Sequence, residues 1–158
     1  MEKDLKFMKI ALSEAERASE KGEVPIGAVI VVDGRVVARG HNLRELNNDP
    51  TAHAEMIAIG KAAKKLKSWR LANSTLYVTV EPCVMCIGAI ILARVARLVF
   101  GCCDPKGGAV GSLYDISNDK RLNHRVEVRP GVMDEEAQAL LKDFFRKLRK
   151  KPPIADGS

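Results

Sequence analysis

The chain has 158 residues, of which 46% are hydrophobic and 29% are charged. This length and composition are typical of one globular domain with a single well-buried core, and nothing in them suggests a second domain. The longest apolar runs, around residues 24–32 and 87–93, are too short to cross a bilayer, and residues 1–20 are too densely charged for a signal peptide. We therefore expect a cytoplasmic protein with no membrane partner, folded as one domain over residues 1–151 and followed by a disordered tail at residues 152–158.

The formal net charge is +6 and the sequence pI is about 9.3, which favours polyanionic partners such as nucleic acids. Much of the positive charge lies in two runs, Lys61, Lys64, Lys65, Lys67 and Arg70, and then Lys142, Arg146, Lys147, Arg149, Lys150 and Lys151. A solvated helix face explains the first run as well as an RNA contact does. The second run is more indicative of RNA binding, because the aromatic residues Phe144 and Phe145 lie inside it.

The first half of the chain predicts a helix, a hairpin and a second helix. Apolar residues recur at helical spacing from residue 4 to about residue 21, and Gly22 is a suitable C-terminal cap. Asp33 and Gly34 form a strong hairpin signal between predicted strands at residues 26–32 and 35–39. A polar loop follows at residues 41–50. Asp49 and Pro50 suit an N-cap and a first helical position, and they predict a helix from about Thr51 to Lys65.

The second half predicts strands that alternate with helices. A strand at residues 74–80, a helix opened by Pro82 and a strand at residues 96–101 form a β-α-β unit, whose two strands should be parallel. A glycine-rich loop at residues 104–112 lacks the Walker spacing of a phosphate-binding loop, so we expect an ordinary flexible loop. A short strand at residues 125–129 precedes the last helix.

That last helix should span residues 134–150. Its expected core stripe consists of Ala137, Leu141, Phe144 and Leu148. With the antiparallel hairpin before the β-α-β unit, the predicted fold is α/β, a three-layer α/β/α domain with a mixed sheet of about five strands.

The residue types that bind zinc recur in two separated motifs. His53 supplies an imidazole, while Cys83 and Cys86, three apart at the start of a helix, share one face and lie where the helix dipole stabilises thiolates. Glu55, two residues beyond His53, could move the proton of a water molecule in the open fourth position. On a regular helix, the side chains of residues i and i+2 point about 200° apart. To serve one site, His53 and Glu55 must therefore lie in an irregular first turn.

Each motif alone has other readings. A His-x-Glu pair occurs by chance, and Cys-x-x-Cys is also typical of a redox pair or of half a structural zinc site. The joint pattern H-x-E…P-C-x-x-C is the known signature of zinc nucleobase deaminases, and it favours a catalytic zinc. Cys102 could in principle add a fourth ligand and make the zinc structural, although we expect it to be a buried small hydrophobe.

Five segments together resemble the bacterial tRNA-specific adenosine deaminases, a branch of the cytidine-deaminase-like superfamily. They are Pro50-Thr51-Ala52-His53-Ala54-Glu55, Glu81-Pro82-Cys83-Val84-Met85-Cys86, Asp104-Pro105-Lys106-Gly107-Gly108, Asn123-His124-Arg125 and Phe144-Phe145-Arg146-Lys147-Leu148-Arg149. The first two segments specify only the superfamily, whereas the last three point to the tRNA branch. The resemblance implies a homodimer that deaminates the wobble adenosine of an arginine tRNA to inosine.

The resemblance also implies roles for particular residues. His53, Cys83 and Cys86 would bind one Zn²⁺ per subunit, Glu55 would shuttle protons, and Ile26, Asn42 and the Ala54 backbone would contact the flipped base. The neighbouring nucleotides of the anticodon stem-loop would be held by Arg44, Asp104, Lys106, Asn123, His124, Phe145 and Arg149.

Three functions are consistent with these motifs. The first is wobble deamination in tRNA. The second, deamination of a free base or nucleoside such as guanine, cytosine or cytidine, would use the same zinc and glutamate but would not need a basic, aromatic-edged C-terminal helix. The third, a noncatalytic RNA-binding subunit with a structural zinc, leaves Glu55 unexplained. Without the resemblance, Asn42 would be expected only to order its loop, and Phe145 could be peripheral core.

Overall fold

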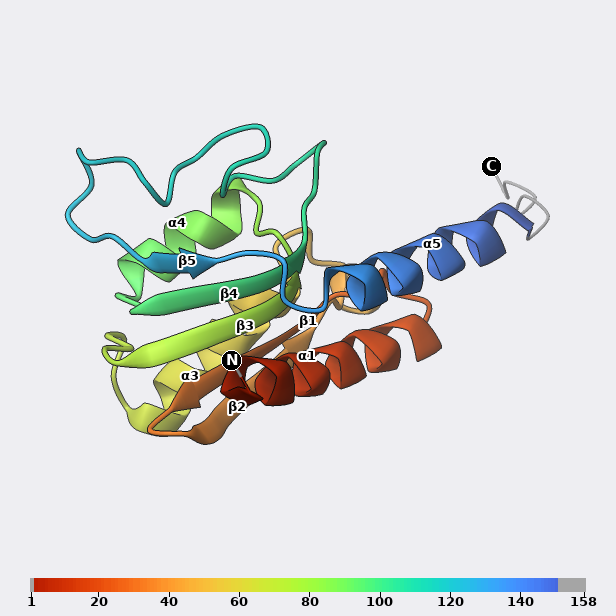
Figure 1. The fold of residues 1–158 in the computed structure, drawn as a ribbon. Helices are drawn as coiled ribbons and strands as arrows, with labels where there is room; N and C mark the ends of the chain where they lie inside the picture. The colour runs from red at the N-terminus through yellow and green to blue at the C-terminus, as the bar shows by residue number, and fades with distance from the viewer. Residues whose placement is uncertain (1, 151–158) are drawn as a thin grey trace.

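A computed structural model describes residues 2–150 and contains one five-stranded sheet in the order β2-β1-β3-β4-β5 (Figure 1). The strands are β1 (Gly27–Val32), β2 (Arg35–His41), β3 (Ser74–Val80), β4 (Arg97–Cys102) and β5 (Glu127–Arg129). The helices are α1 (Glu2–Glu20), α2 (Arg44–Asn47), α3 (Ala54–Leu66), α4 (Val84–Leu92) and α5 (Asp134–Lys150). The expected tail at residues 152–158 lies outside the described residues, and no helix between residues 2 and 150 is long and apolar enough to cross a membrane.

The sheet is mixed, as predicted. Strand β1 pairs antiparallel with β2 and β3, whereas β4 runs parallel to both β3 and β5. The hairpin between β1 and β2 turns at Asp33 and Gly34, whose φ angles of 51° and 74° are both positive, as a two-residue turn of this hand requires. Because β3 and β4 are parallel, their C-terminal ends meet at one edge of the sheet, next to Pro82 and Cys83.

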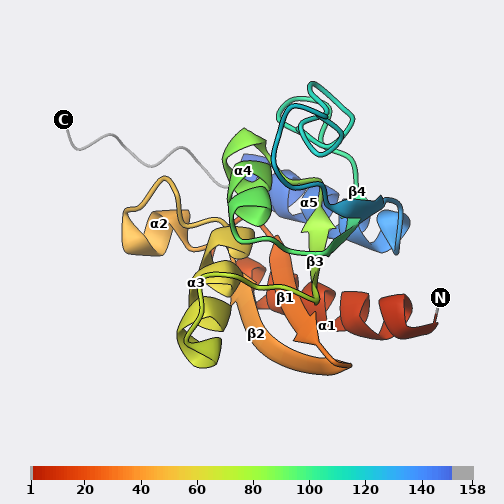
Figure 2. The same ribbon diagram turned by 90° about the vertical axis from the view of Figure 1, so that its left-hand side faces the viewer.

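Helices cover both faces of the sheet, so the three-layer prediction is confirmed. Helices α1 and α5 pack on one face, and α3 and α4 cover the other (Figures 1 and 2). The larger core cluster, between the sheet and α3 and α4, includes Ile30, Leu76, Ile87 and Phe100. This packing fixes where helices α3 and α4 begin, and both begin at the same edge of the sheet.

The predicted start of the second helix was wrong. Helix α3 begins at Ala54 rather than at Thr51, because the Asp49 carboxylate accepts hydrogen bonds from the backbone N–H (2.8 Å) and hydroxyl (2.7 Å) of Thr51 and so closes a turn of its own. His53 is the N-cap, with extended backbone angles. The polar stretch before it was predicted to be loop, but it contains the one-turn helix α2.

Two further details differ from the sequence prediction. Cys83 is the N-cap of α4, which begins at Val84, so Pro82 precedes the helix rather than opening it. In α5 only Ala137 is buried, and Leu148 is 51% exposed, so the expected core stripe does not continue along the helix. The second half of α5 extends past the edge of the sheet and has no strand beneath it (Figure 1).

A buried carboxylate ties the first helix to the sheet. Asp4, 3% exposed, is contacted by guanidinium groups of Arg97 (2.7 and 2.8 Å) and Arg129, and it accepts a hydrogen bond from the Tyr77 hydroxyl (2.7 Å). The Arg97 guanidinium, together with Tyr77 and Arg129, holds the pKa of Asp4 well below its ordinary value of 3.8, although burial opposes this. The folded state therefore favours the ionised carboxylate.

Asp4→Asn is expected to lower the free energy of unfolding at neutral pH by about 2 kcal/mol, because the arginines lose their charged acceptor. A lowered pKa stabilises the fold above the unfolded-state value, and this stabilisation is lost as pH falls. The difference between wild type and variant should thus shrink as pH drops from 6 towards 3, which urea denaturation at several pH values measures. A difference that stays constant across this range would contradict the assignment.

Candidate functional site

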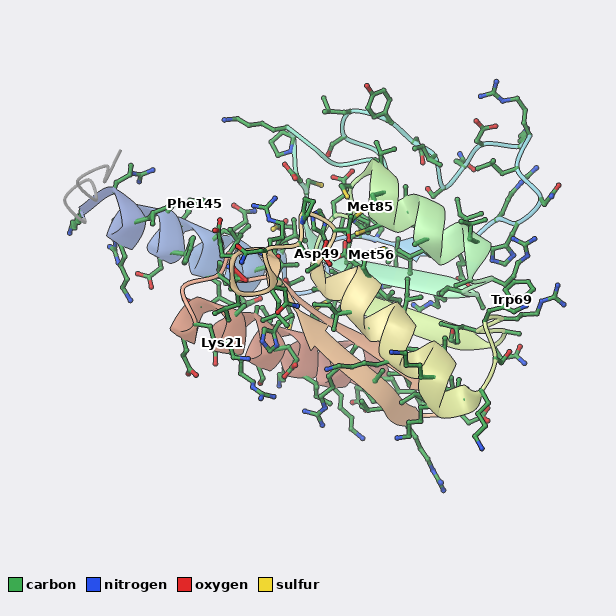
Figure 3. The ribbon with its side chains drawn as sticks, turned by 180° about the vertical axis from the view of Figure 1, so that it is seen from behind. Lys21, Asp49, Met56, Trp69, Met85 and Phe145 are labelled. Atoms are coloured by element: carbon green, nitrogen blue, oxygen red, sulfur yellow. The ribbon has the colours of Figure 1, made fainter. Side chains whose placement is uncertain are left out.

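Three metal-ligand residues meet where helices α3 and α4 begin. The ligand atoms of His53, Cys83 and Cys86 all lie within 4.8 Å of one another, and the His53 Nδ1 atom is 3.5 Å from each sulfur. His53 and Cys83 are the two N-caps, and Cys86 lies in the first turn of α4. Figure 3 shows these two helix starts converging, marked by Met56 and Met85.

The donor set and its spacing fit a zinc ion. Tetrahedral zinc with Zn–S bonds of about 2.3 Å and a Zn–N bond of about 2.0 Å places sulfur and nitrogen about 3.5 Å apart. Both Sγ–Nδ1 distances in this chain have that value. Hydrogen bonding from Cys86, together with His53, lowers the pKa of the Cys83 thiol to about 3, whereas the pKa of Cys86 is raised by its contact with Cys83 and by burial. Both thiols would be deprotonated on binding a metal ion, since zinc binds the thiolate form.

Glu55 lies beside this ligand set in the first turn of α3. Because His53 has extended backbone angles and lies outside the helix, residues 53 and 55 can serve one site, as the sequence required. The Glu55 side chain is 4% exposed and interacts with Cys86, and burial raises its pKa to about 7. A buried carboxyl group at a site with three protein ligands is the arrangement that general acid–base catalysis needs.

Cys102 takes no part in the ligand set. It is 1% exposed in β4 and packs with Val29, Tyr77 and Val99 in the core cluster on the α1 side of the sheet. Burial raises the pKa of its thiol to about 11, so it stays protonated. Among residues 2–150 the ligand group has three members, so a tetrahedral metal ion held there would have its fourth position open to water or substrate.

Two adjoining depressions open next to the ligand set. The smaller, of about 170 Å³, is lined by Val24, Ile26, Asn42, Arg44, His53, Ala54 and Asp104. The larger, of about 610 Å³, is lined by Val24, Ile26, Val80, Cys103, Asp104, Pro105, Lys106, Leu141, Lys142, Phe145 and Arg149. They share Val24, Ile26 and Asp104, so they adjoin, and together they reach from His53 to α5. We call the two together the α5 groove.

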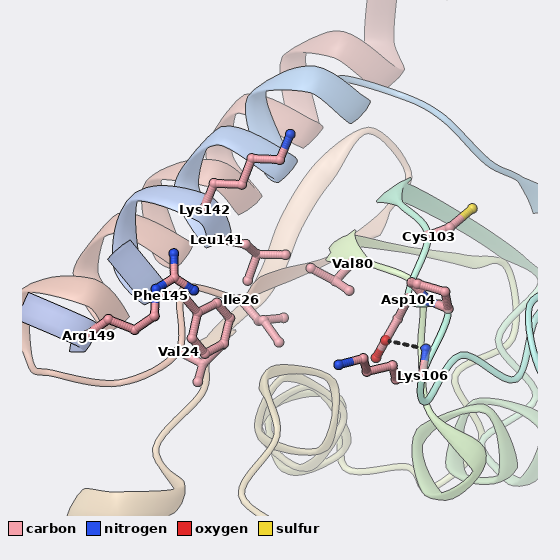
Figure 4. A pocket seen from close by; sticks show the side chains of 11 residues that line it. Val24, Ile26, Val80, Cys103, Asp104, Lys106, Leu141, Lys142, Phe145 and Arg149 are labelled. Atoms are coloured by element: carbon pink, nitrogen blue, oxygen red, sulfur yellow. Dashed lines mark hydrogen bonds between the residues drawn. The ribbon is translucent and has the colours of Figure 1, made fainter. Parts of the chain in front are cut away.

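The walls of the α5 groove are basic and its floor is apolar. Figure 4 shows Phe145 and Arg149 on α5 on one side of Ile26, with Asp104 and Lys106 on the opposite loop. Phe145 is 40% exposed, so its ring is available for stacking. Eight of the base and RNA contacts that the family resemblance implies line this groove: Ile26, Asn42, Arg44, Ala54, Asp104, Lys106, Phe145 and Arg149.

Asn42 has a contact of its own within the loop. It is 4% exposed, and its side-chain oxygen accepts a long hydrogen bond (3.4 Å) from the backbone N–H of Arg44. Its backbone N–H donates to the Ile26 carbonyl (3.1 Å), which joins the loop to β1. Asn42 thus orders its loop and also lines the groove.

Asn123 and His124 are not brought to the groove within one chain. The Nε2 atom of His124 lies 2.7 Å from the carbonyl oxygen of Val95, which precedes β4. That places the pair at the edge of the sheet opposite the ligand set, where the parallel strands β4 and β5 begin.

Sequence reasoning assigned no individual role to three residues at or beside this site, although Lys142 belongs to the second basic run. Lys142 lies three residues before Phe145 on α5, so helical spacing could have placed it in the groove. Val24 carried no signal of its own. Glu81 belongs to one of the family segments, but sequence reasoning assigned it no role. A carboxylate between a buried strand and a cysteine ligand needs a hydrogen-bond partner.

Comparison with known proteins decides the family. The model of the MafB19-like deaminases matches residues 2–149. A tRNA-specific adenosine deaminase of Bacillus subtilis (strain 168) is 53% identical over 155 residues, which cover 98% of this chain and 96% of that protein. The chain belongs to the tRNA-specific adenosine deaminase family. The resemblance seen in its motifs is thereby confirmed.

Solved structures of this family and of a neighbouring one share the fold. A structure from a study of A-to-I editing by tRNA:A34 deaminases at the wobble position superposes with a TM-score of 0.83 at 47% identity, covering 85% of this chain and 98% of that one. A guanine deaminase of Bacillus subtilis superposes less well, with a TM-score of 0.62 at 30% identity and 96% coverage of both chains. The deaminase fold is therefore common to both, and the tRNA branch is the more similar.

Proposed function

We propose that this protein deaminates the wobble adenosine in the anticodon loop of a tRNA, an arginine tRNA by family resemblance, and so produces inosine and ammonia. The observation that carries the proposal is that the basic α5 groove reaches His53, one member of the His-Cys-Cys ligand set beside which Glu55 is buried. Because tRNA is the substrate, we place the reaction in the cytoplasm. A free base would fill only the small end of the groove next to His53.

In the proposed reaction, water replaces the amino group at adenine C6. A zinc ion held by His53, Cys83 and Cys86 would supply hydroxide at neutral pH. Glu55 would take one proton from this water and deliver it to ring N1. It would then take the second proton from the hydroxyl group now on C6 and deliver it to the amino group, which leaves as ammonia, so no external acid is needed. The open fourth position and the burial of Glu55 support this division of roles.

Binding of the flipped base is assigned to the small end of the groove. Ile26 forms an apolar wall, Asn42 hydrogen-bonds the base, and the backbone N–H of Ala54 lies near the reacting centre. The loop nucleotides beside it would lie along α5, where stacking on Phe145 offsets part of the cost of unstacking. Their phosphates would contact Arg44, Lys106 and Arg149, with Asp104 accepting from a base or ribose.

We further propose that two copies form the active homodimer. The outer face of α4 leaves Val84 50% exposed and Leu92 71% exposed, and the loop beside it leaves Leu113 and Tyr114 more than half exposed (Figures 1 and 2). An apolar face of this kind favours a second copy as its occupant. A dimer through α4 would also give Asn123 and His124, which lie far from their own groove, a route to the partner's RNA.

The test compares substrates. Purified zinc-loaded protein is incubated with an anticodon stem-loop carrying a wobble adenosine and, in parallel, with free adenosine, cytidine and guanine. We expect product from the stem-loop alone. Product from a free base or nucleoside, with the stem-loop unchanged, would instead establish the alternative, a small-molecule deaminase.

A matched pair of aromatic variants tests the use of the groove. Phe145→Ala should lower kcat/KM for the stem-loop by about 5-fold to 100-fold, the loss of one base stack. Trp69→Ala removes another exposed aromatic ring, 63% exposed and on the far side of the molecule from Phe145 (Figure 3), and should leave kcat/KM unchanged. Equal effects of the two variants would contradict the placement of the RNA.

A further inference from the structure

A single buried carboxylate holds the loop that forms one wall of the α5 groove. Glu81 is 3% exposed and lies between the end of β3 and Cys83. Its Oε1 atom accepts from the backbone N–H of Asp104 (3.1 Å) and from the Ser112 hydroxyl, and its Oε2 atom accepts from the backbone N–H groups of Val110 (2.9 Å) and Ser112 (3.1 Å). All four donors belong to the loop at residues 104–112.

The loop is shaped to close onto this carboxylate. A Cβ atom at Gly108 would lie 2.3 Å from Oε2 and 2.5 Å from Oε1 of Glu81, closer than any side chain tolerates. The next residue, Ala109, donates its backbone N–H to the Pro82 carbonyl (2.9 Å). Two consecutive residues before Cys83 are therefore fixed to the centre of the loop.

The beginning of the same loop carries two groups that face the groove. The Asp104 carboxylate accepts from the backbone N–H groups of Lys106 (3.1 Å) and Gly107 (3.2 Å), and the Asp104 carbonyl accepts from Gly108 (2.8 Å). Figure 4 shows Lys106 reaching from this turn towards Ile26. The position of Lys106 thus depends on a turn whose two ends, Asp104 and Gly108, both contact Glu81.

We propose that Glu81 is a positioning residue that presets the loop at residues 104–112, and with it Lys106, for RNA. The inference rests on the proposed function, since RNA is the ligand that Lys106 would meet. A loop already ordered before binding loses little conformational entropy when RNA arrives, so the carboxylate acts on affinity. It touches neither substrate nor metal, so it acts on the reaction only through the loop.

Glu81→Gln keeps the size of the side chain, removes its charge and turns an NH₂ group towards backbone donors. We expect KM for the stem-loop to rise about 10-fold or more, because hydrogen bonds to a charged acceptor are lost. The value of kcat should stay within about threefold of the wild-type value, and the zinc content should not change. Glu16→Gln, the same change at an exposed position of α1, is the control and should leave KM unaltered. Loss of kcat or of zinc with KM constant would overturn the proposal.

A double-mutant cycle separates positioning from a general loss of stability. If Glu81 acts by presenting Lys106, Lys106→Ala should raise KM in the wild type but change it little in the Glu81→Gln background. Effects that multiply in the double variant would show that Glu81 and Lys106 act independently, and would reject the inference. Should Glu81→Gln fold poorly, Ser112→Ala removes one of the four donors and should raise KM to a smaller extent, again with kcat retained.

Hydrogen exchange makes the two proposals distinguishable. In the wild type without RNA, the amides of Asp104, Val110 and Ser112 should be protected, and Glu81→Gln should abolish this protection while α4 amides keep theirs. A wild type that fails to deaminate the stem-loop would reject the proposed function alone. A wild type that deaminates it, together with a Glu81→Gln variant of unchanged KM and unchanged protection, would reject the inference alone.

Discussion

Glu55→Ala is expected to lower turnover of the stem-loop by about 10²-fold to 10⁴-fold, the usual contribution of a general acid–base group. The side chain is buried next to the His-Cys-Cys set, and among residues 2–150 the one carboxylate that lines the groove is Asp104, on the opposite wall. Zinc alone could supply the nucleophile, but it could not carry protons to N1 and to the departing ammonia. Single-turnover kinetics with excess enzyme measure this loss without interference from product release.

Glu55→Gln serves as the matched variant, because it keeps the size and hydrogen-bonding reach of the side chain but cannot carry the proton. It should be as inactive as Glu55→Ala, and both should keep zinc, thermal stability and RNA affinity. A Glu55→Gln variant with more than about a tenth of wild-type turnover would contradict proton transfer by this residue. Loss of zinc in either variant would instead show that Glu55 supports the ligand set.

Removing the metal is expected to abolish activity and to destabilise the fold. Cys83→Ser and Cys86→Ser each remove one thiolate from a set of three, so zinc should fall from about one ion per chain to nearly none. Chelator treatment of the wild type should do the same reversibly. A ligand present at about 1,000 times its Kd stabilises the folded state by about 4 kcal/mol. The metal-free protein should therefore unfold at a lower urea concentration than the zinc-loaded protein.

Cys102→Ser and Cys103→Ser are the controls for the metal prediction. Cys102 is buried on the other face of the sheet and Cys103 is exposed in the lining of the α5 groove, so both variants should retain zinc, and Cys102→Ser should also retain turnover. Cys102→Ser should still cost some stability, because a hydroxyl group replaces a thiol in an apolar cluster. Loss of metal in Cys102→Ser would overturn the three-ligand site, since it would make Cys102 the fourth ligand.

Local sequence signals were sufficient where backbone geometry depends on neighbouring residues. Strand β3 and helix α5 have the bounds that the periodicity predicts, and the Asp33-Gly34 turn has the positive φ angles that this pair favours. The start of α3 was misplaced because Asp49 bonds to Thr51 within a turn, a local competitor of the helix cap. The exposure of Leu148 could not be predicted, because it depends on where the sheet beneath α5 ends.

In the candidate site too, some residues could be predicted from the sequence and others could not. His53, Cys83 and Cys86 could be grouped from the sequence because the chemistry of zinc restricts the residue types, and the structure brings their donor atoms together. The basic run around Phe145 indicated RNA binding from the sequence alone, but the groove itself could be anticipated only through the family resemblance, since Ile26 carries no chemical signature. The role of Glu81 needed coordinates, because its four donors come from a loop more than twenty positions later in the chain.

The most direct measurement of the central claim is position-resolved mass spectrometry of an anticodon stem-loop that carries one adenosine at the wobble position and another elsewhere in the loop. After incubation with the zinc-loaded protein and nuclease digestion, the account predicts inosine at the wobble position only, and none with Glu55→Ala. Inosine at both positions would contradict recognition by the groove. An unmodified stem-loop would contradict RNA deamination altogether.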